Sequence, residues 1–528
     1  MMEIDPNDTE FTEEELEKVI QSLLSNKSPW MDGVTYDIIK ILEPTFRDFF
    51  LRLYNACLNT GKVPTSWSTS VIIPMIKPGK PSLNPDNYRP ISLTSSFIRI
   101  LEHMIKNKIE SVFDKTLINE QVGFRKRRCT MDAIVTLEND VKTAIGSKSC
   151  VAAVFFDLSS AFDSIPWEVI MTKVSDSVKG KMLRLIYVLL QTEKAYVQSC
   201  DKFSNHFRFN RGVQQEGVLS PMLFNLCMSD FPLDNIKGKI FVDDIAVWAT
   251  DSSPHGAYIK IKKAVEDAAK WSLEKKLQFS SKTVGVIFSQ YRSQQQNSLT
   301  IHVDNLIVPF VNQTKYLGVL LDSSFNMNNH VENIVRSANQ ALNIMKCLAS
   351  KDWGDDRKIL RLFYAAAVRL RIEYSFPGLM GISAKNLKKL EVVQNLALRI
   401  MTGAMKSNPI PAIRMETGIK SRLHHLALNY TLKVMEIPNH PNQQLIETSK
   451  ANVDTTSNWE NKPPMIPKLI NMIEGFGLNL TFLEAKKATS NQKAKNLRIE
   501  LDTEPKCSKS DLAPLKTIVF ITNSGFPL

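Results

Sequence analysis

The chain has 528 residues, of which 43% are hydrophobic and 23% are charged, values that are ordinary for a folded globular protein. A chain of this length exceeds what one hydrophobic core supports, so we expect two to four lobes. The formal net charge of +12 suits a polyanionic partner, although many basic proteins bind no nucleic acid. Seven scattered cysteines without a Cys-x-x-Cys pair argue against a disulfide framework or a zinc site, and indicate a reducing compartment.

Membrane insertion and secretion are not expected. No segment approaches the ~18 apolar residues of a membrane span, and the acidic N-terminus lacks the pattern of a signal peptide. We therefore expect an intracellular protein, of the cytoplasm or the nucleus or both, that is not secreted.

The first local signal is the start of a helix. Thr12 and Glu15 are spaced as a capping box, and Phe11 and Leu16 are spaced as a hydrophobic staple. These residues carry no chemistry. We expect residues 1–70 to form an N-terminal helical extension.

A basic segment follows this extension. Residues 71–76 have the composition of a strand, which leads to Lys77 and, after a polar loop, to Arg89. Eleven Lys and Arg residues stand against five Asp and Glu residues between Lys77 and Thr130. Taken alone, Lys77 and Arg89 fit a solvated basic face better than a binding site.

Residues 151–157 form a continuous apolar run that ends at Asp157. Such a run is typical of a strand that is buried on both faces, and a helix is predicted after it. Phe162 stands five residues beyond Asp157, and on spacing alone a core position explains it equally well. Residues 164–210 predict helices and a strand near 195–198.

A second acidic site lies in residues 238–249, where two apolar runs flank Asp243 and Asp244. Val and Ile on both sides favour two strands, with the polar pair at the tip of a hairpin. Adjacent carboxylates repel each other, so a divalent cation with oxygen ligands would stabilise this tip. For the Asp pair alone, an ordinary surface turn is the better explanation.

The two acidic strand ends together favour one site. Asp157 beside Asp243 and Asp244 would give three carboxylates that can hold two cations, the arrangement that stabilises the attacking and leaving oxygens in phosphoryl transfer. A polymerase needs such a set.

The remaining chain predicts helices and then a linker. From Val331 onward three apolar stripes follow helical spacing, and Gly403 is a suitable C-cap for the third. Beyond about residue 435 the chain is rich in Asn, Lys, Pro and Ser. The stripes comprise Ile334, Ala338, Ala341, Leu342, Met345 and Leu348; Ile359, Leu362, Phe363, Ala366 and Leu370; and Leu387, Leu390, Val393, Ala397 and Ile400.

Several sequence blocks, taken in chain order, resemble those of the reverse transcriptases of non-LTR (LINE-type) retrotransposons, in particular the jockey-like group of arthropod elements. Seven blocks match in the same order, and the resemblance runs from about residue 10 to about residue 425. The blocks are 71–80 with Tyr88-Arg89-Pro90-Ile91-Ser92-Leu93, Gly123-Phe124-Arg125, 157–163, 212–221, Phe241-Val242-Asp243-Asp244, Lys282-Thr283 and Tyr316-Leu317-Gly318-Val319.

The resemblance implies an α+β right-hand polymerase with fingers, palm and thumb, followed by a helical and linker tail. It implies fingers over residues 71–150, a palm with the reverse transcriptase catalytic core over 151–330, and a helical thumb over 331–435. Residues 436–528 would be a linker that ends at a truncated RNase H start, where Asn523 replaces a metal-binding Asp.

The resemblance also implies roles for single residues. Asp157, Asp243 and Asp244 would be the catalytic metal ligands, and Lys282 would protonate the leaving pyrophosphate. Nucleotide binding would involve Lys77 and Arg89 at the triphosphate, Gln215 at the nucleotide, and Phe162 as a block to a ribose 2′-hydroxyl. Template and primer would be bound by Arg125, Tyr316 and Gly318.

The implied reaction is the addition of deoxynucleoside triphosphates to the 3′ end of a DNA primer on an RNA template, with two Mg²⁺ ions, or Mn²⁺ in their place. Within the matched region, the sequence departs from the family at two places. Trp30 and Met31 stand where relatives keep Gly-Pro, and Glu216 replaces a glycine that lets the backbone approach the substrate. The alternative is therefore a catalytically impaired, nucleic-acid-binding remnant of such an element.

Overall fold

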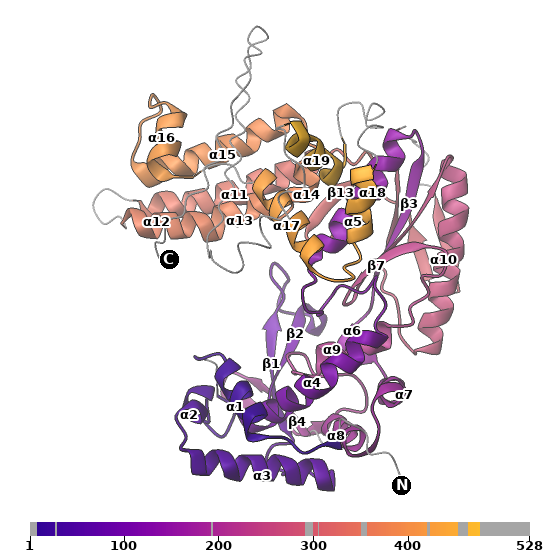
Figure 1. Ribbon diagram of the computed structural model, residues 1–528, viewed down its shortest axis with the longest axis vertical. Helices are drawn as coiled ribbons and strands as arrows, with labels where there is room; N and C mark the ends of the chain where they lie inside the picture. Colours follow the sequence, from indigo (N-terminus) through magenta and orange to yellow (C-terminus); the bar gives the residue numbers. More distant parts are fainter. Residues whose placement is uncertain are drawn as a thin grey trace.

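The computed structural model describes residues 8–26, 29–191, 194–290, 299–304, 306–349, 356–419, 423–451 and 463–475. Figure 1 shows an N-terminal lobe at the bottom, a sheet at the right and a cluster of C-terminal helices at the top. None of the helices in these ranges is long and apolar enough to cross a membrane.

The N-terminal lobe is helical, as its sequence predicts. In the capping box, Thr12 Oγ1 accepts a hydrogen bond from Glu15 N at 3.2 Å, and Glu15 Oε2 accepts one from Thr12 N at 2.9 Å. Phe11 and Leu16 are both buried. The helices are α1 (Glu13–Ser22), α2 (Tyr36–Lys40) and α3 (Pro44–Thr60), and α1 packs on the long helix α4 (Ser96–Thr116).

The first sheet joins two distant parts of the chain. Strand β1 (Thr69–Ile76) pairs antiparallel with β2 (Tyr88–Leu93) and parallel with β4 (Lys194–Ser199). Two short strands, β5 (Lys202–Phe203) and β6 (Phe207–Arg208), pair with β4. Residues 194–208 therefore complete the sheet of the predicted fingers, although the sequence placed them within the palm range of 151–330.

The second sheet has the order β7-β8-β3-β9. Every residue of β3 before Asp157 is buried, which confirms the strand predicted to be covered on both faces. Helix α10 (Pro254–Glu274) packs against β3 and β8, and α5 (Thr130–Gly146) packs against β3 and β7. The strands are β3 (Cys150–Asp157), β7 (Lys237–Phe241), β8 (Asp244–Asp251) and β9 (Val284–Phe288).

In chain order, the helices between β3 and β7 are α6 (Ala161–Ser164), α7 (Trp167–Ser177), α8 (Gly180–Gln191) and α9 (Ser220–Met228). Two antiparallel hairpins follow β9: β10 (Thr300–Val303) with β11 (Leu306–Pro309), and β12 (Gln313–Tyr316) with β13 (Val319–Asp322).

The predicted thumb helices are present, but one of the three apolar stripes predicted for them is wrong. Helix α15 ends at Gly403, whose φ of +69° fits the predicted C-cap. Helix α12 continues through a π-helical segment, Tyr364–Arg369, into α13, and Leu360, Tyr364, Val368 and Ile372 are buried there. The predicted Ile359, Leu362 and Leu370 are exposed instead. These helices are α11 (Asn328–Leu348), α12 (Arg357–Phe363), α13 (Leu370–Glu373), α14 (Phe376–Leu379), α15 (Ala384–Thr402) and α16 (Ile410–Thr417).

The predicted linker from residue 436 contains two packed helices, which is a correction. Helices α18 (Gln443–Ala451) and α19 (Met465–Gly475) pack on each other and on α17 (Leu423–Glu436). Glu138 of α5 accepts hydrogen bonds from Met465 N at 3.1 and 3.2 Å, so a buried carboxylate caps the start of α19. The predicted RNase H start and Asn523 lie outside the described residues.

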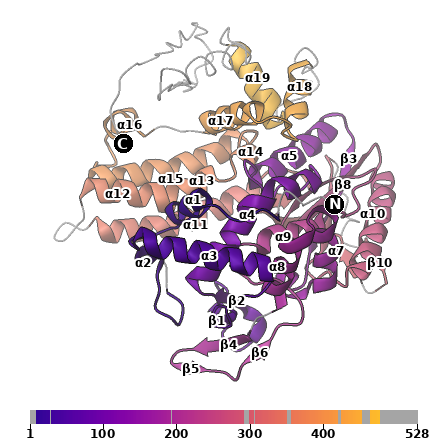
Figure 2. The same cartoon turned by 60° about the horizontal axis from the view of Figure 1, so that its bottom comes forward.

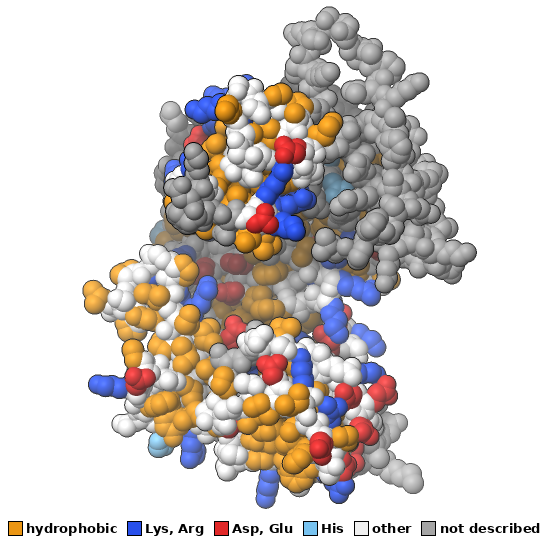
Figure 3. All heavy atoms as spheres, turned by 90° about the vertical axis from the view of Figure 1, so that its left-hand side faces the viewer, with side chains coloured by type: hydrophobic (Ala, Val, Ile, Leu, Met, Phe, Trp, Pro, Cys, Tyr) orange, Lys and Arg blue, Asp and Glu red, His pale blue; other side chains and the backbone are white. Residues whose placement is uncertain are grey.

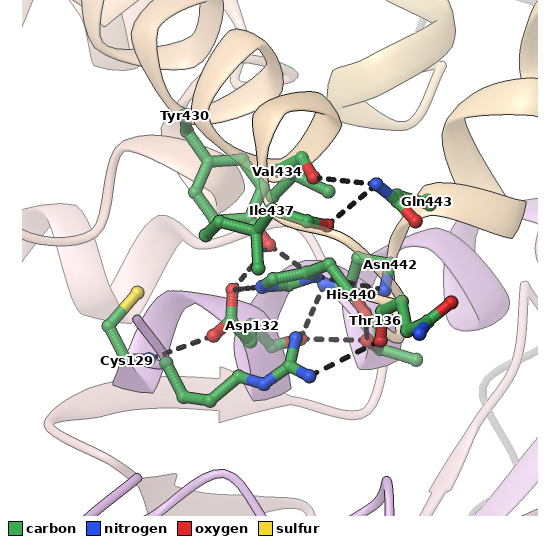
Figure 4. Close-up of polar contacts among 11 residues, drawn as sticks. Cys129, Asp132, Thr136, Tyr430, Val434, Ile437, His440, Asn442 and Gln443 are labelled. Carbon is green, nitrogen blue, oxygen red and sulfur yellow. Dashed lines mark hydrogen bonds and ion pairs between the residues drawn. The ribbon is translucent and has the colours of Figure 1, made fainter. Parts of the chain in front are cut away.

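A buried polar cluster fastens α17 and the turn after it to α5 (Figure 4). Asp132 accepts hydrogen bonds from Cys129 N at 2.8 Å and from Tyr430 Oη at 2.9 Å, and it lies 3.4 Å from His440 Nε2. Asn442 Nδ2 donates to Tyr430 Oη at 2.7 Å. Residues 430–442 are therefore part of the folded body.

Candidate active site

Strand pairing places the predicted aspartates at one end of the second sheet. In the antiparallel pair of β3 and β8, Asp157 stands directly opposite Asp244. Asp243 belongs to the two-residue turn between β7 and β8, because Phe241 pairs with Asp244. The hairpin predicted from the two apolar runs is confirmed, and all three aspartates lie at the same end of the sheet.

The turn itself is strained. Val242 has a φ of +61°, a value that is rare for a β-branched residue, and its side chain is buried. Gly123 packs against this turn so closely that a Cβ atom there would lie 2.6 Å from Val242 N. The Gly123 N–H and the Val122 N–H both point to the Ile240 carbonyl. Residues 122–123 therefore hold the hairpin from behind, a role that the sequence did not indicate.

Asp243 and Asp244 both have a raised pKa, chiefly because they are buried. Burial, followed by the charge of Asp157, raises the pKa of Asp243, and Arg89 and Lys282 oppose this rise. Burial, followed by the charges of Asp243 and Asp157, raises the pKa of Asp244 to about 6. Asp244 is nevertheless partly exposed to water, which moderates the effect. A cation at this end of the sheet would relieve the repulsion.

The donor set fits a hard divalent cation, since such ions prefer carboxylate oxygens. Within the described ranges, however, no three His, Cys, Asp or Glu side chains are grouped closely enough to hold a metal ion as they stand. Asp157 is engaged elsewhere: its Oδ2 accepts a hydrogen bond from Ser280 Oγ and lies 3.6 Å from Lys282 Nζ. Binding a metal through Oδ2 would require this oxygen to exchange these partners.

The loop before β9 fixes Asp157 from its far side. Thr283 Oγ1 accepts a hydrogen bond from Asp157 N at 3.2 Å, and Ser280 N donates to the Asp157 carbonyl at 2.7 Å. Lys282 keeps 79% of its side chain exposed, so its amine is free to move. Sequence reasoning gave a role to Lys282 but none to Ser280 or to Thr283, although Thr283 belongs to the matched block Lys282-Thr283.

A second group of predicted residues meets beside these aspartates. Gln215 Nε2 donates a hydrogen bond to Asp163 Oδ2 at 3.0 Å. Phe162 stacks on Phe224, with ring centroids 4.7 Å apart and planes 6° apart. A pocket at this place is lined by Pro90, Asp163, Gly212 and Gln215 among others, and none of the three aspartates lines it.

Two cations of the first sheet reach toward these acids. Burial raises the pKa of Asp163, and the nearby positive charge of Lys77 opposes this rise. The positive charge of Arg89 opposes the rise in the pKa of Asp243 in the same way. Lys77 Nζ also donates to the Asp86 carbonyl at 2.7 Å. In Figure 3 the two lobes flank a hollow in which acidic side chains lie. Residues 77, 89, 157, 163, 215 and 243 thus come from distant segments to one region.

Comparison with known proteins gives this arrangement a family. Residues 77–321 match the family model described as reverse transcriptase (RNA-dependent DNA polymerase). This match identifies a reverse transcriptase domain within the chain. The chain is 27% identical over 402 residues to "Probable RNA-directed DNA polymerase from transposon BS" of Drosophila melanogaster, a match that covers 74% of this chain and 44% of the relative.

A second relative is the RNA-directed DNA polymerase from mobile element jockey of Drosophila funebris, at 25% identity over 82% of this chain and 48% of that protein. The chain thus spans less than half the length of these curated relatives. The structure of apo telomerase from Candida tropicalis aligns with a TM-score of 0.38 at 10% identity, over 86% of this chain and 73% of that chain. That score is too low to carry an argument.

Three reverse transcriptase residues predicted to bind template or primer have other contacts. The Arg125 side chain is 7% exposed and bonds to Asp114 Oδ1 and to the Ile118 carbonyl, each at 2.8 Å. Tyr316 is 3% exposed, and its ring packs on Phe155. Gly318 has a φ of +82° and lies under the ring of Tyr374. All three organise the fold in this structure.

The two departures from the reverse transcriptase pattern have different structural outcomes. Trp30 does not adopt positive φ; the local turn places positive φ at Gly33, whose N–H donates to the Trp30 carbonyl at 3.0 Å. Glu216 keeps the glycine-like conformation with a φ of +74°, and its side chain is exposed. The free-energy cost of having Glu216 in place of glycine therefore arises from its backbone conformation.

Proposed function

We propose that this chain is an RNA-directed DNA polymerase of a jockey-like non-LTR retrotransposon, which adds deoxynucleotides to a DNA 3′ end on an RNA template. The observation that carries the proposal is the register of β3 and β8, which sets Asp157 opposite Asp244 and beside Asp243 at one end of the sheet. Lys77 and Arg89 face the same region from the first sheet.

Reverse transcriptases use divalent metal ions, and we propose two Mg²⁺ ions held by Asp157, Asp243 and Asp244. Such ions, when bound, neutralise charge on the attacking and leaving oxygens. The raised pKa of Asp244 supports this proposal, because burial and then the charges of Asp243 and Asp157 disfavour its ionised form, and a positive counter-charge would offset both effects.

The remaining residues would position the nucleotide and move one proton. Lys77 and Arg89 would bind the triphosphate, and Gln215, held by Asp163, would contact the nucleotide. Phe162, braced by Phe224, would exclude a ribose 2′-hydroxyl. Lys282 would leave its ion pair with Asp157 and donate a proton to pyrophosphate.

The decisive experiment is primer extension on an RNA template with Mg²⁺, using the parental chain, Asp243→Asn and the control Asp267→Asn. Asp267 is an exposed residue of α10, so the control makes the same chemical change away from the site. We expect extension by the parental chain and the control, and none by Asp243→Asn, with RNA binding retained by all three. Extension by Asp243→Asn would contradict the assignment. RNA binding without extension by any of them would favour the impaired remnant.

A further inference from the structure

The β4, β5 and β6 strands form a hairpin that projects from the molecule (Figure 2). Nearly every residue from 199 to 211 is exposed. The hairpin carries none of the residues proposed for polymerisation. Between residues 194 and 211 the sequence has four Lys or Arg residues, one Asp residue and five aromatic or imidazole rings.

Two of the cations and three of the rings share one face of the hairpin, whereas Lys202 and Phe207 lie on the other. Lys194 stands directly opposite Arg208, and Gln198 stands directly opposite Phe203. Between these pairs, the rings of Tyr196 and His206 lie 6.1 Å apart. Residues 194, 196 and 198 alternate along β4 and so point to the same face. This face, which we name the β4 platform, thus presents a cation pair, a ring pair and an amide beside a ring.

The cation pair is unfavourable unless an anion covers it. Like charges directly opposite each other in an antiparallel pair are destabilising. Neither Lys194 nor Arg208 forms an ion pair with a carboxylate of the described segments. Phe203 is 49% exposed, so a hydrophobic ring is also left without cover. A partner that is both anionic and flat would therefore find charge and ring contacts together on the platform.

Strand register links the platform to the proposed polymerase site. Tyr196 pairs with Val71 of β1, and Met75 of β1 pairs with Arg89 of β2. Because Val71 and Met75 are four residues apart on one strand, they share a face, and Arg89 shares it with Tyr196. The platform and Arg89 thus lie on one side of a continuous sheet.

We propose that the β4 platform binds single-stranded nucleic acid. Lys194 and Arg208 would meet phosphates, the rings of Tyr196, His206 and Phe203 would stack on bases, and Gln198 would meet a base edge. Exposed rings interleaved with cations would also suit an anionic membrane surface. Nucleic acid fits better, because the platform continues the face that carries Arg89. The proposal goes beyond the polymerase function and does not require it.

The test measures binding of the full chain to fluorescent oligo-U RNA and oligo-dT DNA without a primer, as a function of salt. The variants are Lys194→Ala/Arg208→Ala and Phe203→Ala. The matched control is Lys263→Ala/Lys270→Ala, which removes the same charge from the exposed face of α10. Lys194→Arg/Arg208→Lys keeps the charge and serves as the rescue. Unfolding midpoints of all variants establish that each is folded.

For the charge variant, we expect the slope of log affinity against log salt to fall by about 1.4, since each contact with a single strand contributes about 0.7. For Phe203→Ala, we expect affinity to fall on the order of tenfold with an unchanged slope. The control and the rescue should match the parental chain. RNA and DNA arms that respond alike indicate stacking without recognition of the 2′-hydroxyl.

The proposal is overturned if the platform variants bind both oligonucleotides as the control does. It is also overturned if they lose binding only to vesicles of anionic lipid, since that outcome identifies a membrane surface. Primer extension is measured in parallel on a template-primer whose template extends only a single unpaired nucleotide beyond the primer 3′ end. Loss of that activity in the parental chain would overturn the polymerase function and leave a platform result standing.

Discussion

At the scale of single residues, Asp244 bears a cost that a cation would remove. Its pKa is raised to about 6, chiefly by burial and then by Asp243 and Asp157. A raised carboxyl pKa destabilises the folded state above that pKa and has no effect below the unfolded value near ~4. After allowing for its exposure, we expect Asp244→Asn to stabilise the metal-free protein by about 1 kcal/mol at neutral pH.

The measurement is urea unfolding of both proteins without divalent ions at pH 7.5 and pH 4, and again with Mg²⁺ at pH 7.5. The advantage of Asp244→Asn should be present at pH 7.5 and absent at pH 4. Mg²⁺ should stabilise the parental protein more than the variant. A variant that is less stable at pH 7.5 would show that Asp244 is not in repulsion with its neighbours.

A second prediction at this scale concerns Glu216, which holds a φ of +74° with an exposed side chain. Left-handed backbone costs a residue with a Cβ atom on the order of 1 kcal/mol, which glycine avoids. Glu216→Gly should therefore raise the free energy of unfolding by roughly 0.5–1 kcal/mol, whereas Glu216→Gln should leave it unchanged. Thermal unfolding of the three proteins checks this. Equal gains in the free energy of unfolding from both variants would show that the cost comes from the charge of Glu216.

At the scale of elements, the hairpin of β7 and β8 depends on Gly123 behind it. A Cβ atom there would lie 2.6 Å from Val242 N and 2.8 Å from Val242 Cγ2, so backbone would have to move. We expect Gly123→Ala to destabilise the protein by about 1–3 kcal/mol and to abolish primer extension. Gly33→Ala is the comparison: it bears the cost of positive φ but meets no neighbouring atom, so it should lose stability without losing extension. Normal extension by Gly123→Ala would mean that the turn tolerates displacement.

Local periodicity explains which elements the sequence could predict. The buried run before Asp157 and the two runs around Asp243 have lengths and compositions that only strands fit, so the acidic ends were foreseeable. The pairing of β4 with β1 was not, because it joins segments far apart in sequence and leaves no local pattern. Ser280 and Thr283 were missed for the same reason. Helices α18 and α19 were hidden by polar neighbours that resemble a linker.

At the scale of the whole molecule, the C-terminal helices depend on the buried cluster around Asp132. Burial alone would raise the pKa of Asp132, but hydrogen bonds from His440, Cys129 and Tyr430 outweigh it and hold the pKa below its usual value. Asp132→Asn removes the charge that these donors face. We expect it to destabilise the protein by about 2–3 kcal/mol above pH ~4, with the difference lost as the pH falls below that value.

Hydrogen exchange locates the effect of Asp132→Asn. Protection should fall in residues 423–451 and α5 while the strands of the second sheet stay protected. Asp140→Asn is a poor control because Asp140 bonds to Trp248 and Lys237, so Asp267→Asn of α10 is used instead. A uniform loss of protection through the whole chain would show that the cluster stabilises everything equally.

The parallel pairing of β1 with β4 determines when, during synthesis of the chain, the first sheet can be completed. Helices α4 and α5, strand β3 and helices α7 and α8 are all synthesised between these two partners. Throughout that interval β1 has one open edge, and an open strand edge pairs readily with other chains. The first sheet therefore closes only after the acidic strand β3 has been made, so translation that stalls before Lys194 releases a chain prone to aggregation.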